Sequence, residues 1–556
     1  MLVAAMRKLC RVGLAVVLAT ALCVLTLVDM PPQLPEPPTA PPPTPGVEPP
    51  GPRSIVAYSW ARRLALDYRP SRECNDGIND SSLPLDGTPM ESTSAFVSSS
   101  FIASNPTGFA RTTGSRSSIE SEESKKWLET IPRRLFLYSA HLDIRVAGYP
   151  SVRVIGVKRE STPPLLSAGT LFCTIWHNDD DGRTLSFSVE ALISDIWLDD
   201  WGGSGDGYTG ILVTCQLPRT NGLQSVYVGP QSCYRNPSHS LLVSKLTEET
   251  VVDRGETNKI ASTVASTGRY ENQFTLCIKA LDFDEDISDR LVAFVELNRI
   301  LGAGMIYIYV FNVHENVLRV LRMYEKSNVV RWFSFDLPGD LPNDAAGRRE
   351  LFAKDVWIKR RMELIPYNHC FYENLYGSEF VVPIDIDESI IPVGRNNWSQ
   401  LLMDERNKLG GSFEDFASYA VRNVYFFPEL QNRNAAAGYV SSIDGESIET
   451  EPCYLDTVRT AVVSPEGDSV KSFVSTKRAL TVHNHYALTT LNPSTRRAYH
   501  LDPRDALKHH HRICDDRYLD CDLMMEDIVI DKSALRYADE LKARINIALA
   551  HLSTLT

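Results

Sequence analysis

Residues 274–283 read FTLCIKALDF, residues 287–303 read ISDRLVAFVELNRILGA, and residues 305–313 read MIYIYVFNV. The first and third segments are short apolar runs of the kind that form buried strands, and the second repeats apolar residues near i, i+3, i+4 and i+7 before Gly302. This pattern predicts a β-α-β unit, with a mainly parallel sheet and a ligand at the carboxyl ends of its strands. Neither GxGxxG nor GxxxxGK[ST] accompanies it, which argues against Rossmann dinucleotide and P-loop nucleotide sites.

The chain before this unit is rich in short β-type runs. Between residues 134 and 246, segments such as SVRVIGVKRE and GILVTCQLP alternate with Pro, Gly, Asn and Asp clusters, which is typical of an all-β module. We expect a β-sandwich. Its Trp197, Trp201 and Tyr208 lie in or near a Gly/Asp-rich loop, where they either stack on a sugar or, the favoured alternative, pack in the rim or core.

The N-terminus has the pattern of a membrane anchor. Arg7, Lys8 and Arg11 precede an uncharged apolar run at 12–28, which favours a transmembrane signal-anchor over a cleaved signal peptide. Positive charge before the run predicts a cytoplasmic tail at 1–11 and a lumenal remainder, the single-pass type II arrangement. Twelve prolines between Pro31 and Pro52 and the Ser/Thr-rich continuation predict a stem over 29–125.

Composition narrows the class of protein. The chain has 556 residues and a formal net charge of −13, so it lacks the basic field on which nucleic-acid binding depends. Of its eleven cysteines, Cys10 and Cys23 lie in or beside the apolar run. The nine that remain are an odd number, so at least one is free or used between chains. Cys514 and Cys521 are close enough in sequence to form a small loop. Two glycosylation sequons, at Asn79 and Asn397, agree with a lumenal glycoprotein.

Three carboxylates follow an apolar run, expected to be a strand, in the second half of the chain. EFVVPIDIDESIIPV, residues 379–393, is an apolar strand that ends in Asp385, Ile386, Asp387 and Glu388. Alternate residues of a strand face the same side, so Asp385 and Asp387 are expected to project together. Paired hard oxygen ligands suit Mn²⁺ or Mg²⁺, which in turn binds the diphosphate of a nucleotide-sugar.

Histidines concentrate near the C-terminus. Six of the twelve lie between His483 and His511, and His483 and His485 alternate on an expected strand. Imidazole is a good ligand for Mn²⁺, and at least one of His485, His510 and His511 is expected to complete the metal shell. The alternative is a histidine-rich surface loop, and three consecutive histidines cannot all face one site.

These segments resemble glycosyltransferase family 92, formerly called the DUF23 family. The resemblance rests on residues 276–312, on LIPYNHCFYENLYGSEFVVPIDIDESIIP, and on TVHNH with ALKHHHRICD, and it covers roughly Phe274 to Cys514. It implies an inverting, metal-dependent enzyme of the Golgi membrane with a GT-A fold. Studied members of the family transfer galactose from UDP-galactose to glycans, including fucosylated N-glycans.

The resemblance also implies roles for particular residues. Asp385 and Asp387 become metal and nucleotide-sugar ligands, Lys279 becomes a donor-side candidate, and alignment on Arg512 makes His510 the family histidine. With the histidine pattern, the expected metal ligands are Asp385, Asp387, His485 and His510, and the expected donor-binding residues are Lys279, Asp385 and Arg512. The chain has Asn368-His369-Cys370 where the family has Asn-Asp-Cys, and His510-His511-Arg512 where it has His-Tyr-Arg. These departures put donor and acceptor specificity in doubt.

The expected fold class is an α/β GT-A-type glycosyltransferase domain preceded by an all-β sandwich-like module and a single transmembrane helix. The expected boundaries are 126–268 for the β-rich module, 269–515 for the catalytic domain and 516–556 for a C-terminal helical segment. Glu414 and Asp415 are candidates for the catalytic base, although a solvated acidic start to a helix is the favoured interpretation of either one.

The expected function is a hexosyltransferase with a UDP-sugar donor, a glycan or glycoprotein acceptor and Mn²⁺ or Mg²⁺ as cofactor. The main alternative is a membrane-tethered carbohydrate-binding protein without activity. A metal-dependent hydrolase is a third and weaker one, because few further carboxylates or histidines accompany Asp385 and Asp387.

Overall fold

The computed structural model describes residues 71–74, 127–160, 169–198, 201, 207–244, 270–431, 453–515 and 519–554, all within the unit that spans residues 57–556. None of the helices in these ranges is long and apolar enough to cross a membrane. The expected membrane helix at 12–28 lies outside the described residues, so the observed fold does not include it. Most of the expected stem lies outside them as well.

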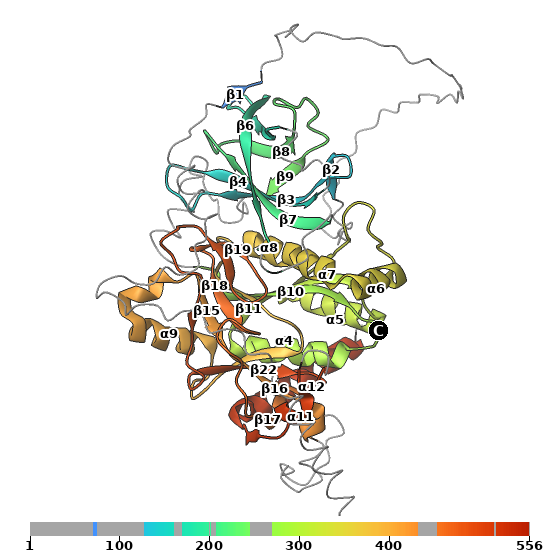
Figure 1. Ribbon diagram of the computed structural model, residues 1–556, viewed down its shortest axis with the longest axis vertical. Helices are drawn as coiled ribbons and strands as arrows, with labels where there is room; N and C mark the ends of the chain where they lie inside the picture. Colours follow the sequence, from blue (N-terminus) through green and yellow to red (C-terminus); the bar gives the residue numbers. More distant parts are fainter. Residues whose placement is uncertain are drawn as a thin grey trace, which may run out of the picture. The chain divides into compact units, whose positions relative to one another are not determined.

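The N-terminal module is one nine-stranded sheet (Figure 1). Its strands are β1 (Arg72–Glu73), β2 (Leu128–Ile131), β3 (Leu135–Asp143), β4 (Ser151–Arg159), β5 (Phe172–Asn178), β6 (Thr184–Asp195), β7 (Tyr208–Gln216), β8 (Leu223–Gly229) and β9 (Leu241–Ser244). β1 belongs to the segment expected to be a stem, yet it pairs with β6, and Cys74 beside it is disulfide-bonded to Cys233.

This sheet closes on itself, which corrects the expected sandwich. β6 is twelve residues long, and its first half pairs with β5 while Ala191 to Asp195 pair with β7. β9 joins β8 to β3 on the other side of the ring. A sandwich would hold two separate sheets face to face, whereas here two strands are shared between the two halves of one continuous sheet.

Alternation along β3 gives the closed sheet two apolar faces. Leu135 and Leu137 belong to the core inside the ring, while Phe136 and Tyr138 point outward into a second core shared with the C-terminal half. Strand residues alternate between faces, so a strand that is buried on both faces reads as a continuous apolar run. The module is therefore packed against the C-terminal half along its outer face.

The C-terminal half is built around a seven-stranded mixed sheet of order β12-β11-β10-β13-β18-β15-β21. The strands β10, β11, β12 and β13 are mutually parallel, and β18 runs antiparallel to both β13 and β15. Their bounds are β10 (Asn272–Asp282), β11 (Ala303–Asn312), β12 (Val330–Ser334), β13 (Ser378–Pro383), β15 (Ser418–Val421), β18 (Lys471–Ser475) and β21 (Tyr499–His500).

Helices cover both faces of this sheet (Figure 1). One face carries α4 (Ser288–Leu301), α5 (Glu315–Lys326), α9 (Trp398–Leu409) and α12 (Ala538–Thr554), and the other carries α7 (Val356–Met362) and α8 (Leu364–Glu373), which also contact the closed sheet. The remaining helices are α6 (Ala345–Lys354), α11 (Cys521–Met524), η4 (Gly410–Asp415), η6 (Cys453–Leu455) and η7 (Ser533–Tyr537). The expected β10-α4-β11 unit is present.

Three small sheets complete the described part of this half. β14 (Glu388–Pro392), β22 (Ala506–His511) and β16 (Asn423–Phe426) form one of them. β17 (Val458–Thr460) pairs with β23 (Ile528–Ile530), and β19 (Ala479–Val482) pairs with β20 (Ala487–Thr490).

The expected fold class is thus wrong. The chain holds a closed β-sheet, a mixed sheet and three small sheets, where we expected a sandwich followed by a GT-A-type α/β domain. Sequence patterns located β10, α4 and β11 because their periodicity is local. The closure of the first sheet and the antiparallel strands of the second arise from pairings between residues far apart in sequence.

Candidate active site

A cavity of 1420 Å³ opens at the carboxyl ends of β10 and β13. Lys279 lies near the end of β10, where the pairing with β11 shifts register between Ile278 and Leu281. Such a bulge re-aims a side chain. Asp385 follows the end of the neighbouring parallel strand β13, so topology brings these two residues to the same edge of the sheet.

Asp385 is held between two lysines. Its Oδ1 lies 3.1 Å from Lys279 Nζ and its Oδ2 lies 3.0 Å from Lys471 Nζ, while the Tyr367 hydroxyl donates to Oδ1 at 3.5 Å. Burial raises the pKa of Asp385, but the two ammonium groups outweigh it and hold that pKa well below its usual value. Asp385 is therefore an ionised, already neutralised carboxylate.

Lys279 itself lies between two carboxylates, those of Asp385 and Glu363. Its Nζ also lies 3.2 Å from Glu363 Oε1. Burial lowers the pKa of Lys279, while Asp385 and Glu363 raise it above the usual value. The side chain thus stays a cation at the wall of the cavity.

Asp387 pairs with His510. A carboxylate only accepts, so His510 Nε2 donates to Asp387 Oδ2, at 3.3 Å. Burial raises the pKa of Asp387, but this hydrogen bond and the charge of His510 lower it, and the net pKa is about 2. Both side chains line the cavity.

The local structure around Asp387 differs from the expected strand alternation. Asp385 and Asp387 lie in the turn between β13 and β14 rather than in a strand, and Glu388 begins β14. The two aspartates face the same cavity because of this turn. Glu388 is 3% exposed and forms ion pairs with Lys471 and Lys508, which are both buried.

The three consecutive histidines of β22 point to alternate faces of the strand, as strand geometry requires. In β22, His510 pairs opposite Glu388 and faces the cavity, while His509 and His511 point the other way. His509 Nε2 lies 3.9 Å from Asp531, and His511 Nδ1 lies 3.5 Å from Asp456. The expectation that three consecutive histidines do not share one site is confirmed.

His483 and His485 lie in the turn between β19 and β20, not on a strand as expected. Both line the cavity. His485 Nδ1 donates to the Val470 carbonyl at 2.7 Å, which leaves its Nε2 as the atom with a lone pair. Burial and the charge of Lys471 lower the pKa of His485 to about 3, so the ring is neutral.

Arg512 also lines the cavity, 3.6 Å from Asp515, and the neighbouring Cys514 is bonded to Cys521 as the short spacing suggested. Glu414 and Asp415 do not line it. They lie in η4, where Glu414 is 59% exposed and forms an ion pair with Arg478. The structure does not bring these two carboxylates to the other predicted site residues.

Sequence reasoning missed the buried lysines. Lys471 begins the apolar run KSFVS and Lys508 follows Ala506-Leu507, so each looked like the ordinary edge of a strand. A charged residue inside a run that is otherwise buried was the available signal, because such a charge requires a partner.

We tested which residues fit a divalent cation. Asp387 and His510 fit once His510 Nε2 releases the proton that it donates to Asp387, since a carboxylate oxygen and an imidazole nitrogen then converge at the cavity wall. Asp385 fits less well, because both of its oxygens already face ammonium groups that would repel a cation. His485 is neutral and offers Nε2, as a ligand must.

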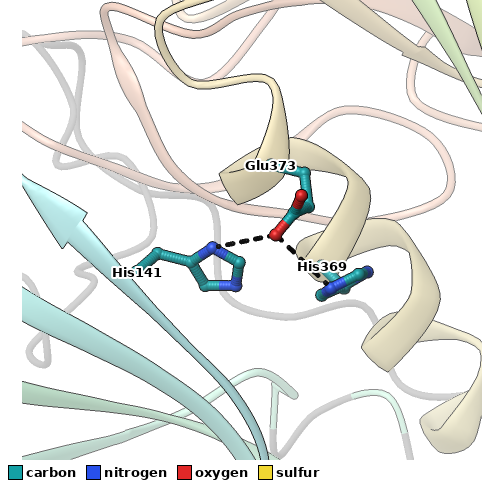
Figure 2. Close-up of side chains that lie close together, drawn as sticks. All are labelled: His141, His369 and Glu373. Carbon is teal, nitrogen blue, oxygen red and sulfur yellow. Dashed lines mark ion pairs between the residues drawn. The ribbon is translucent and has the colours of Figure 1, made fainter. Parts of the chain in front are cut away.

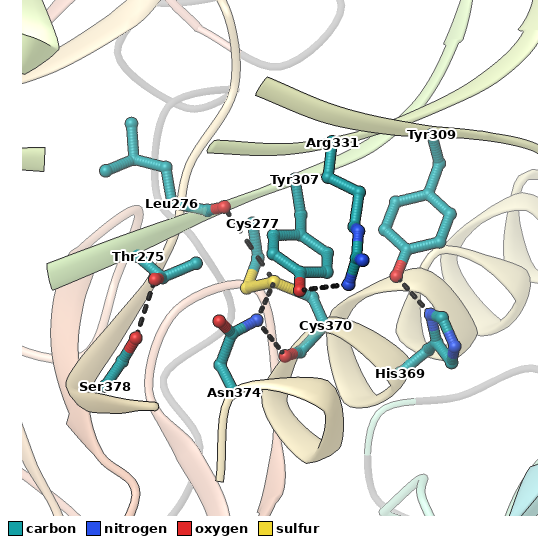
Figure 3. The surroundings of a disulfide bond; sticks show 10 residues. All are labelled: Thr275, Leu276, Cys277, Tyr307, Tyr309, Arg331, His369, Cys370, Asn374 and Ser378. Atoms are coloured by element: carbon teal, nitrogen blue, oxygen red, sulfur yellow. Dashed lines mark hydrogen bonds between the residues drawn. A yellow bond between two sulfur atoms is a disulfide. The ribbon is translucent and has the colours of Figure 1, made fainter. Parts of the chain in front are cut away.

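A disulfide stands behind this site. Cys277 of β10 is bonded to Cys370 of α8, and Figure 3 shows the bond between the strand and the helix, with Asn374 beside it. Four disulfides join eight of the nine described cysteines, and Cys453 is free. The expected free cysteine is confirmed.

Comparison with known proteins assigns the class. Residues 272–545, the half of the chain that contains the cavity, match glycosyltransferase family 92 and belong to that family. A beta-1,4-galactosyltransferase of Caenorhabditis elegans, galt-1, is 23% identical over 235 residues, which are 42% of this chain and 48% of that protein. The chain thus spans about half the length of this relative.

Proposed function

We propose that this protein is an inverting glycosyltransferase that transfers a hexose, galactose from UDP-galactose, to glycan acceptors. The observation that carries the proposal is the Asp387–His510 pair at the wall of a large cavity, within the segment that belongs to family 92. The choice of galactose is supported by the name of the C. elegans relative.

The cavity wall holds six cationic and six acidic side chains, and its cations are the groups that a nucleoside diphosphate requires. Its wall includes the basic side chains Lys279, Arg290, Arg349, Lys359, Arg360 and Arg512. Fixed cations around a leaving diphosphate stabilise the charge that develops as the sugar departs. Asp385 holds Lys279 and Lys471 in place, so its role in the proposal is to position these cations.

Asp387 and His510 would hold Mn²⁺ or Mg²⁺, with His485 as a further candidate ligand. When bound, the ion supplies additional positive charge to the diphosphate. Glu388 Oε1 lies 3.6 Å from His510 Nδ1, just beyond hydrogen-bond distance, and is the carboxylate that would orient the ring on a small approach. A second partner of this kind fixes the ring of a ligating histidine.

The acceptor side is formed in part by the closed sheet. Trp197 and Trp201 line the cavity, and Trp201 lies 4.3 Å from His483 between ring centroids. Trp197 is only 8% exposed, so it supports Trp201 from behind. Tyr208 is buried and donates to Asp340, which leaves it outside this role. An indole face beside polar groups is suited to stacking on a sugar.

Direct displacement requires a base on the acceptor side. The acceptor oxygen bonds to the sugar C1 as the bond from C1 to the UDP oxygen breaks, and the hydroxyl proton passes to a carboxylate. Asp468 is the candidate that we propose. It is exposed at the cavity and accepts a hydrogen bond from Ser469, a residue with positive φ (51°). Backbone strain of this kind gathers at functional sites.

We further propose that the enzyme works in the lumen of the Golgi. Disulfides form and persist in oxidising compartments, and the described part of the chain contains four of them. Glycan acceptors such as fucosylated N-glycans are found in the same compartment.

An assay with UDP-sugars, Mn²⁺ and fucosylated N-glycan acceptors tests the proposal. We expect transfer from UDP-galactose, a loss of about 10²–10³-fold in kcat for Asp387→Asn, and a loss of about 10²–10⁴-fold for Asp468→Asn. Asp404→Asn, in an exposed residue of α9, is the matched control.

Binding separates the enzyme from a carbohydrate-binding protein without activity. Mn²⁺-dependent thermal stabilisation by UDP is expected, because a ligand that binds only the folded form raises its stability. If UDP gives no stabilisation and no UDP-sugar is consumed above the Asp387→Asn background, the proposed activity is refuted.

A further inference from the structure

A second cluster of metal-ligating side chains lies away from the cavity. His141 of β3 and His369 and Glu373 of α8 bring three ligand atoms within 4.8 Å of one another, and within the described ranges no other group of three His, Cys, Asp or Glu residues does so. Figure 2 shows both imidazoles directed at the same carboxylate oxygen. None of the three residues lines the cavity.

The spacing is close to that of a metal shell. Glu373 Oε1 lies 3.5 Å from His141 Nδ1 and 3.7 Å from His369 Nε2. With zinc bonds of about 2.0–2.1 Å, the ligand atoms of a tetrahedral site lie roughly 3.3 Å apart. The two carboxylate–imidazole distances exceed this by a few tenths of an ångström, and the two nitrogens, which lie within 4.8 Å of each other, would be drawn together by the ion. His369 and Glu373 are four residues apart on one helix, so they share a face.

Each ring is oriented by a hydroxyl on its far side. His141 Nε2 lies 2.9 Å from Ser139 Oγ, and His369 Nδ1 lies 2.5 Å from the Tyr309 hydroxyl (Figure 3). Metal-ligating histidines almost always have their second nitrogen held in this way.

The surroundings favour a small, borderline-soft ion. His369 is fully buried and His141 is 2% exposed, and rings of Tyr138, Phe333 and Tyr372 pack around them. Glu373 is 18% exposed, which leaves a route to solvent for a fourth ligand. Two nitrogens and one carboxylate oxygen are a set that zinc takes, whereas Mg²⁺ and Ca²⁺ prefer oxygen alone.

We propose that His141, His369 and Glu373 form a zinc site that joins the closed sheet to α8. Water supplies the fourth position in this proposal. The ion would tie the two halves of the described structure at a point outside the cavity, so its role is structural and independent of the proposed sugar transfer.

The test uses the full chain carrying Asp387→Asn and His510→Gln, so that the cavity pair does not contribute metal. After chelation and dialysis against zinc, elemental analysis is expected to give one zinc per chain, and cobalt substitution is expected to give the intense visible absorption of a four-coordinate site. Adding His369→Gln or Glu373→Gln is expected to weaken zinc binding by more than about 100-fold.

His177→Gln is the matched control, since His177 is another buried histidine of the closed sheet and is 2% exposed. It is expected to retain the zinc. If His369→Gln fails to fold, the more exposed Glu373→Gln decides the question. The proposal is overturned if the parent chain takes up no zinc, or if Glu373→Gln binds it as tightly as the parent does. Either result would make the cluster an ion pair only.

Discussion

Two clusters of carboxylates and histidines stand at different places in this protein, and their counter-charges differ. In the cavity, Asp385 and Glu388 are faced by Lys279, Lys471 and Lys508. In the cluster of His141, His369 and Glu373, the cation beside the carboxylate is the guanidinium of Arg331, 3.9 Å from the second oxygen of Glu373.

The difference teaches that ligand type alone does not define a site. Cations close to a carboxylate neutralise it, so that carboxylate attracts a metal ion less strongly. Glu373 has the Arg331 guanidinium 3.9 Å from its Oε2, farther away than the lysines are from Asp385, and its Oε1 faces the two imidazoles, which suits a metal ion. Four predictions follow from this contrast, ordered from the largest expected effect.

Lys471→Met tests the charge balance of the cavity. Lys471 is 1% exposed, and its loss leaves Asp385 and Glu388 with one fewer cation. The free energy of unfolding is expected to fall by about 3–5 kcal/mol in denaturant titrations, as for other broken buried pairs. Lys354→Met, in an exposed pair with Glu350, is the control and should change it by less than about 1 kcal/mol. An equal, small change in both variants would remove the charge-balance argument.

Tyr309→Phe tests the support of the second cluster. The variant removes the hydroxyl next to His369 Nδ1, and zinc affinity is expected to fall about 10–100-fold. Tyr307→Phe is the control. It removes the corresponding hydroxyl two residues earlier on β11, and that hydroxyl accepts a hydrogen bond from Arg331 instead of contacting a histidine. Competition with a chelator measures both affinities. Equal affinities for the two variants would contradict the orienting role of Tyr309.

His485→Gln tests whether the cavity histidine is neutral. The pKa of His485 is lowered to about 3, so below its unfolded value of about 6.5 the unfolded chain binds a proton that the folded chain does not. Stability therefore falls as the pH decreases from about 6.5 toward 3, by up to about 1.4 kcal/mol per pH unit from this group. The slope of the unfolding free energy against pH should decrease in the variant. The exposed His551→Gln should leave it unchanged, and a wild-type slope in His485→Gln would show that the ring is not neutral.

Trp201→Ala has the smallest expected effect. Loss of a stacking surface of about 0.5–1.5 kcal/mol should raise the KM for the acceptor roughly 3–10-fold and leave the KM for the donor unchanged. Trp332→Ala, on β12 and outside the cavity, is the control. If the KM for the donor rises instead, Trp201 contacts the donor and not the acceptor.

Local pattern located part of this site and not the rest. Asp385 and Asp387 were predictable, because carboxylates after a buried strand are visible in the sequence, whereas His510 was singled out from three consecutive histidines by the family resemblance. The lysines that neutralise Asp385 come from β10 and β18, almost two hundred residues apart, and no spacing rule links them. His369 was noticed only as a departure from the family, since its partner His141 lies on another module.

The fold followed the same division. Periodicity found β10, α4 and β11, which are consecutive in the chain. Periodicity did not predict the closure of the first sheet. β6 pairs with β5 along its first part and with β7 along its last part, and no residue of β6 marks this change of partner in the sequence.

The Cys277–Cys370 bond has a practical consequence for anyone who produces this protein. Cys277 is two residues from Lys279, and Cys370 is adjacent to His369, so a single covalent link anchors both clusters. Synthesis in a reducing host would leave strand and helix untethered beneath both clusters at once. Secretory expression, with the oxidative folding machinery of that route, is therefore the condition under which sugar transfer and zinc uptake should be measured.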